Sequence, residues 1–158
     1  MEPSITITGI DEVLLRLKDL QSFEMQRRGL NLGMRRAGEF LKRLMQHKAP
    51  VDTGKLADSI TVTTRETTAA EAVVRVGPSG KLAWRAKFVE FGTKAHQIRT
   101  KHAFALADIE TGTVFGRIVN HPGGRQRAFV RPTFDEGEDQ AREIAAASII
   151  DFIEEQAG

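Results

Sequence analysis

The chain has 158 residues, no cysteine, 23 lysines and arginines and 21 aspartates and glutamates, giving a formal net charge of +2. Such a length suits one domain with one buried core, and the absence of cysteine excludes a disulfide framework and thiolate metal sites. No apolar run approaches a membrane span and the first residues do not form a signal-peptide pattern, so we expect a soluble protein without membrane contact.

The charges are unevenly distributed along the chain. Residues 75–131 contain eleven lysines and arginines against three acids, whereas residues 135–158 contain eight acids against Arg142 alone. A basic middle and an acidic end are compatible with ordinary solvated surfaces. A polarised interface that meets nucleic acid or an acidic partner is the alternative.

The first half of the chain predicts a strand, two helices and a hairpin. Residues 5–10 alternate apolar and polar side chains like a short strand, and residues 11–20 have helical spacing with Asp11 as a plausible cap. Between residues 24 and 48, apolar side chains recur every three or four positions until Pro50, which predicts a long amphipathic helix. Residues 60–66 and 70–77 are rich in valine and threonine and predict an antiparallel hairpin.

The second half predicts a short helix, an extended segment and a long C-terminal helix. Trp84, Phe88 and Phe91 are spaced for a helix that ends at Gly92, and we expect Phe88, Phe91 and Phe129 to be core residues more than interface anchors. Candidate strands near residues 103–109 and 114–120 make residues 94–124 an extended hairpin or loop.

The C-terminal helix, over residues 132–156, has an apolar stripe wider than one face. Such a helix is covered on more than one side, either by another subunit or by the rest of its own chain. The predicted fold class is therefore α+β, in which a long N-terminal amphipathic helix and a C-terminal helix pack on a small, mostly antiparallel sheet. One domain is expected over residues 1–158, with the extended segment 94–124 inside it.

One tripeptide suggests an enzyme. Asp52, Thr53 and Gly54 form the Asp-Thr-Gly that carries the catalytic carboxylate of aspartic proteases, but that chemistry needs two carboxylates sharing a proton. The chain has one such tripeptide, after a long helix and Pro50 rather than inside an all-strand fold. We expect a structural turn in which Asp52 or Thr53 caps a backbone N–H and Gly54 permits the tight conformation.

Other chemical motifs are incomplete. The stretch VRVGPSGK lacks the glycine spacing and the Ser or Thr after the lysine that a phosphate-binding loop needs, so a turn is expected there. The four histidines, at positions 47, 96, 102 and 121, lack metal-ligand spacing, and Ser59 and His121 could be matched into a triad only by guesswork. We therefore predict no catalytic, metal or cofactor-binding residues, no cofactor and no enzymatic activity.

Five segments, taken in order, carry a resemblance to a known family: ITGIDEVLLRLKDL, APVDTGKLADSI, RVGPSG, KFVEFGT and HPGGRQRAFVRPTFDEG. Together they resemble the neck or tail-completion proteins of long-tailed bacteriophages, which include the Z-type minor tail protein of lambda-like phages. The sequence departs from the family pattern at Ala128, where proline is common before the phenylalanine, and in the long segment between Thr93 and His121.

The resemblance implies an α+β structural virion protein that forms a homo-oligomeric ring at the head–tail junction, completing the tail and joining it to the head. The implied partners are other copies of the chain, a head-completion (stopper) protein and a tail-terminator or tail-tube protein, with passive contact to packaged DNA in the channel. The implied location is the neck of the virion, and the host bacterial cytoplasm during assembly.

Two alternatives accompany this interpretation. A tail terminator or another minor tail protein would share most of the same features. A DNA-binding module, a different class of function, has the basic middle in its favour. It lacks a recognition-helix motif and tyrosine, and its aromatic residues have core spacing rather than that of a stacking platform.

Overall fold

The computed structural model describes residues 23–68, 71–101, 104–108 and 111–157. The strand and helix expected within residues 1–20 lie outside this part of the chain. The chain divides into two compact units: residues 1–83 with 129–158, and residues 84–128. We describe each unit by itself, and the expectation that residues 1–158 form a single domain stays a prediction.

Helix α2 (Phe23–Lys48) is the centre of the first unit and confirms the long amphipathic helix. Its core-facing side chains recur at three- and four-residue spacing, so one stripe of the helix is buried while arginines occupy another side. Ala49 still donates its N–H to the carbonyl oxygen of Met45, and Pro50 follows immediately after. The buried stripe consists of Leu30, Met34, Ala37, Leu41 and Met45.

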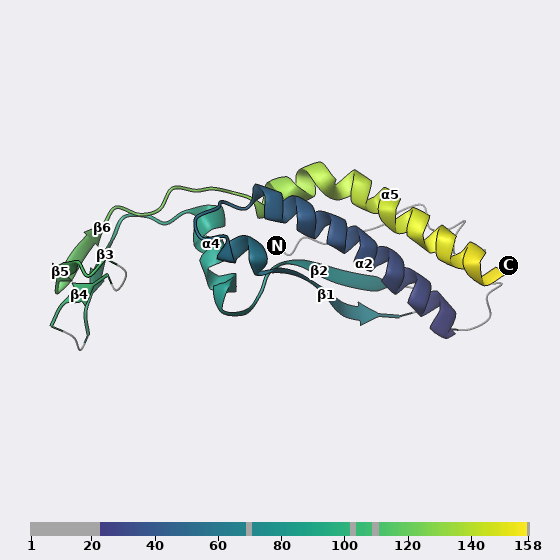
Figure 1. Ribbon diagram of the computed structural model, residues 1–158, viewed down its shortest axis with the longest axis horizontal. Helices are drawn as coiled ribbons and strands as arrows, with labels where there is room; N and C mark the ends of the chain where they lie inside the picture. Colours follow the sequence, from purple (N-terminus) through teal and green to yellow (C-terminus); the bar gives the residue numbers. More distant parts are fainter. Residues whose placement is uncertain (1–22, 69–70, 102–103, 109–110, 158) are drawn as a thin grey trace. The chain divides into compact units, whose positions relative to one another are not determined.

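Helix α5 (Val130–Ala157) runs alongside α2, as Figure 1 shows. Glycines allow the two helices to approach closely: a Cβ added at Gly33 would lie 2.7 Å from the carbonyl oxygen of Ala145 and 2.6 Å from Cγ1 of Ile149. The α5 side chains Ala141 and Ala145 pack with Ala37 and Leu41 of α2. The α2–α5 pair is thus the main packed layer of the first unit.

The other side of α2 is covered by a hairpin of β1 (Ile60–Thr67) and β2 (Ala72–Pro78). The strands pair antiparallel with one irregularity between Thr64 and Glu66, which confirms the predicted hairpin. A Cβ added at Gly38 of α2 would lie within 3 Å of side-chain atoms of Val62 and Val74, so the sheet rests directly on the helix. Helix α2 therefore lies between α5 and the hairpin (Figure 1).

Short elements join these parts. The four-residue helix α3 (Lys55–Asp58), which the sequence did not predict, follows α2, and Gly54 begins it with φ of 76°. The 3-10 turn η1 (Gly80–Leu82) follows β2 and confirms that VRVGPSGK is a strand end and a turn. Ser79 donates its N–H to the carbonyl oxygen of Ser59, which ties the two junctions together.

The second unit begins with helix α4 (Ala83–Phe91), which ends at Gly92 with φ of 69°, as predicted. It continues into the arm, by which we mean the described residues within 94–124. In the arm, β3 (His96–Arg99) pairs antiparallel with β6 (Ile118–His121), and β4 (Leu106–Ala107) pairs with β5 (Val114–Gly116).

The structure of the arm confirms an extended hairpin, but its strands differ from the predicted ones. Of the expected strand at 103–109, the described residues 104–108 contain the two-residue strand β4. Strand β3 was not predicted because His96–Arg99 contains a single apolar side chain. At the base, Thr93 and Gly124 exchange backbone hydrogen bonds of 2.9 and 3.1 Å. None of the helices in the described ranges is long and apolar enough to cross a membrane.

Candidate assembly surfaces

The Asp-Thr-Gly tripeptide lies in the turn between α2 and α3. Gly54 provides the left-handed conformation that the turn requires. The Asp52 side chain is exposed, and helix α3 receives no side-chain capping hydrogen bond, so the expected cap by Asp52 or Thr53 was wrong. The glycine alone sets the direction of the chain here.

Structural contacts are made by three of the residues considered for chemistry, whereas His102 lies outside the described part of the chain. Ser59 donates its hydroxyl to the carbonyl oxygen of Leu56 at 2.7 Å. Strand pairing brings His96 and His121 together with ring centroids 5.0 Å apart, a contact that sequence spacing did not reveal. His121 accepts the N–H of Gly123 on Nδ1. Within the residues described, no group of three His, Cys, Asp or Glu side chains could hold a metal ion.

One face of α4 carries three exposed aromatic side chains at i, i+4 and i+7 spacing. Trp84, Phe88 and Phe91 are 56%, 50% and 75% exposed, whereas Ala86 and Glu90 on the other side are buried. Trp84 and Phe88 meet edge to face with centroids 5.5 Å apart. The expectation of core positions was therefore right for Phe129, which is fully buried, and wrong for Phe88 and Phe91.

The arm also exposes apolar side chains. Its sheets are two-stranded and cannot bury both of their faces. Phe104 is 97% exposed, and the other large apolar side chains on the arm surface are Ile98, Val114, Phe115 and Ile118. Together with the aromatic face of α4, they give the second unit an apolar surface that a partner could cover.

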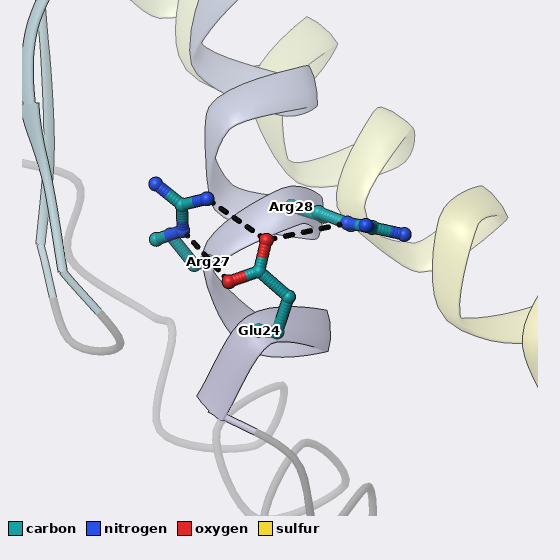
Figure 2. Close-up of polar contacts among 3 residues, drawn as sticks. All are labelled: Glu24, Arg27 and Arg28. Atoms are coloured by element: carbon teal, nitrogen blue, oxygen red, sulfur yellow. Dashed lines mark hydrogen bonds and ion pairs between the residues drawn. The ribbon is translucent and has the colours of Figure 1, made fainter.

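Helix α2 carries its basic residues on sides that the core does not use. At its beginning, the Glu24 carboxylate contacts the guanidinium groups of Arg27 at 2.8 Å and Arg28 at 3.5 Å (Figure 2). The hydrogen bond from Arg27 lowers the pKa of Glu24. Farther along, Arg35, Arg36 and Arg43 are exposed and make no ion pair with any carboxylate in the described part of the chain.

Helix α5 divides its apolar residues between the core and the surface. Ile149 packs with Leu30 of α2, and the Phe152 ring lies over Gly29 of the same helix. Ile150 alone of these three is exposed, at 40%. The wide apolar stripe predicted from the sequence is thus covered mostly by α2 of the same chain.

A shallow groove of about 440 Å³ runs along α2 beside α5. Its apolar floor comes from Leu32 of α2 and Ile144 of α5. Arg35, Arg36 and Arg43 border it together with Glu39, whose carboxylate contacts Lys42 at 3.4 Å. The groove therefore combines an apolar floor with a positive rim, which suits an acidic amphipathic partner.

Comparison with known proteins matches part of the chain to a protein family. The family model described as "Bacteriophage HK97-gp10, putative tail-component" matches residues 11–92, just over half of the chain. The matched region includes α2, the β1–β2 hairpin and α4, whereas the arm and α5 lie beyond it. No curated protein and no solved structure matches the chain significantly.

Proposed function

The chain belongs to the HK97-gp10-like family of bacteriophage tail components, and on this premise we propose that it forms a homo-oligomeric ring at the head–tail junction. In that position it completes the tail and joins it to the head. Its role is mechanical and without catalysis or cofactor, since its work is to present surfaces to neighbouring proteins.

The observation that carries this proposal is the exposed apolar surface of the second unit. Three aromatic side chains on one face of α4 are each at least half exposed, and Phe104 of the arm is almost fully exposed. Large apolar side chains exposed in such number, three of them on one helix face, mark a candidate site of protein contact. Aromatic residues are also enriched among the residues that dominate binding energy.

The arm supplies a second reason to expect partners. An isolated two-stranded hairpin is marginally stable in water, because it leaves one or both faces exposed. Connections of this length inside a domain are also unusual unless they have a function. We propose that the arm reaches a neighbouring subunit or an adjacent ring of the neck.

The partners we propose follow from a position in the neck. Copies of the chain contact each other within the ring, a head-completion protein lies on one side, and a tail-terminator or tail-tube protein lies on the other. The basic residues of the arm, including Arg99, Lys101 and Arg117, provide for passive contact with DNA passing through the channel. Assembly takes place in the host cytoplasm and the product is part of the virion.

Electron-microscope class averages of the purified protein and of phage particles lacking it test this proposal. We expect rings in the purified sample, and particles in which filled heads and tails of normal length remain separate. Overlong tails would instead identify a terminator, because a terminator stops growth of the tube. A monomer at every concentration, with no ring in the neck of wild-type particles, would refute the ring.

A further inference from the structure

The outward side of α2 carries positive charge that no carboxylate among the described residues neutralises. Arg36 and Arg43 are seven residues apart, so they lie within about 20° of each other around the helix and about 10 Å apart along it. Both border the groove whose floor includes Leu32. We call Arg36 and Arg43, with their neighbour Arg35, the basic stripe.

The outward side of α5 carries the opposite pattern. Glu143, Ile150 and Glu154 lie within about 40° of one another around the helix, over about 16 Å of its length. All three are exposed, and neither carboxylate has an ion-pair partner among the described residues. We call these three residues the acidic stripe. The nearby acids Glu138 and Asp139 differ, because Arg142 of the same helix pairs with both.

We propose that the acidic stripe of one copy docks along the basic stripe of the next copy, with Ile150 over the apolar floor of the groove. Because both stripes belong to the same compact unit, every copy offers one of each. Such a contact is heterologous, and it closes into a ring when the rotation between copies permits. This inference rests on the proposed function and identifies the surfaces by which the ring would form.

A second copy fits the groove better than a nucleic acid does. DNA phosphates would satisfy the arginines but leave the floor of Leu32 and Ile144 uncovered. DNA would also leave the unpaired acids of α5 unexplained. A single contact between copies matches positive with negative charge and apolar with apolar surface.

The energetics assign separate roles to the two kinds of contact. An exposed ion pair contributes little by itself, so a row of pairs mainly sets register, orientation and association rate. Ile150 and the groove floor add apolar burial to these pairs. We therefore expect assembly to weaken as salt screens the exposed charges.

Charge reversal on each stripe tests the contact. One variant carries Arg36→Glu and Arg43→Glu, and the other carries Glu143→Arg and Glu154→Arg. Each alone should raise the concentration for half-assembly by roughly tenfold or more, as measured by light scattering. Lys55→Glu with Lys81→Glu makes the same charge change as the first variant at exposed positions outside both stripes, and it should assemble like wild type.

Mixing the two reversed variants gives the decisive measurement. In the mixture, the unaltered acidic stripe of the first variant faces the unaltered basic stripe of the second, and the two reversed stripes also match. Association should therefore return in the mixture and in a chain that carries all four substitutions. If circular dichroism shows that the Arg36→Glu, Arg43→Glu variant does not fold, Arg36→Gln with Arg43→Gln replaces it. This neutral variant should weaken assembly to a smaller degree.

The other outcomes separate this contact from the proposed function. Rings that persist unchanged in both reversed variants, or a mixture that stays dissociated, overturn the stripe contact while leaving the ring intact. Loss of binding to a labelled DNA duplex by the Arg36→Glu, Arg43→Glu variant, with normal assembly, overturns it in favour of a DNA site. A wild-type monomer absent from the virion neck would instead refute the proposed function itself.

Discussion

Gly33 shows how one residue determines the distance between the two long helices. Helix propensity alone would favour alanine at this position by up to about 1 kcal/mol. A Cβ added here, however, would lie 2.7 Å from the backbone oxygen of Ala145, and backbone atoms cannot move aside as a side chain can. The close approach of α2 and α5 therefore depends on glycine at this position.

Gly33→Ala should lower the free energy of unfolding by about 1–3 kcal/mol, because the helices must separate or distort to accept the methyl group. Urea unfolding followed by circular dichroism measures the change. Gly77→Ala is the matched control, since nothing lies within 4 Å of the added Cβ at that position. A Gly33 variant at least as stable as the wild type would contradict the close helix contact.

Asp52→Asn should leave stability within about 0.5 kcal/mol of wild type, because the exposed side chain caps nothing. The same substitution should change no peptide cleavage, since a solitary carboxylate in a turn lacks the second carboxyl that protease chemistry needs. Thermal unfolding and a peptide-hydrolysis assay check the two parts. Hydrolysis by the wild type that the variant loses would show that the tripeptide is catalytic after all.

Glu24 provides a prediction on pH. The hydrogen bond from Arg27 lowers the pKa of Glu24 below its ordinary value of 4.5, so ionised Glu24 favours the folded state above that pH. This contribution of Glu24 to the stability of the fold is lost as pH falls through the lowered folded-state pKa. Glu24→Gln should therefore be less stable than wild type near neutral pH, and the difference in urea midpoint should disappear in acid. A difference that is constant down to the lowest pH would exclude ionisation as its cause.

At the scale of elements, local sequence pattern predicted the long helices and the first hairpin well. Apolar spacing and Pro50 predicted α2 to within a residue or two at each end, and α5 begins two residues before the prediction. Such elements can be predicted because the spacing of their apolar side chains is a property of the local sequence alone. Strand β3 was not predicted, because its stability comes from pairing with β6, about twenty residues away in the chain.

The aromatic residues show a second limit of sequence pattern. Helical spacing placed Trp84, Phe88 and Phe91 on one face of α4, and the structure confirms that placement. Spacing does not say what covers the face. Burial depends on elements that are distant in the sequence. The same helical spacing of aromatic residues is therefore compatible with a buried face and with an exposed face.

Deleting the arm tip, residues 111–113, should leave the first unit folded while reducing phage yield. The tip closes through local contacts, including the N–H of Gly112 bonded to the carbonyl oxygen of Asp108, and it lies outside the first unit. Circular dichroism checks the fold, and complementation of a phage lacking the gene checks phage assembly. Normal yield from the shortened protein would show that the arm tip does not contribute to assembly.

At the scale of the whole molecule, the structure changes the expected source of assembly energy. The wide apolar stripe expected on the C-terminal helix includes Ile149, Ile150 and Phe152, and another subunit was one of the two covers expected for it. Two of these side chains face α2 of the same chain, so less apolar surface of α5 remains for a neighbour. Charged contacts should then contribute a larger share of the free energy of assembly. Salt should therefore weaken assembly more than it would weaken a purely apolar interface.

Ile150→Asp should strongly reduce assembly, because it places a carboxylate where the neighbouring apolar floor is expected. Its effect on stability should be small for a 40% exposed side chain. Light scattering at low and high salt measures assembly, and urea unfolding measures stability. Ile149→Asp is the contrasting variant, since it places a charge in the core and should unfold the first unit. Assembly of the Ile150 variant at wild-type concentrations would exclude this face of α5.

The two ends of the arm lie next to each other, and this matters for recombination between phage genomes. The paired backbone bonds of Thr93 and Gly124 hold the two ends of the segment side by side. An insertion with adjacent ends can be lengthened, shortened or replaced without moving either junction, which is the geometry that domain insertion requires. Recombination among phages could therefore exchange residues 95–122 as a unit, which would alter the surface that the arm presents while conserving the fold that carries it.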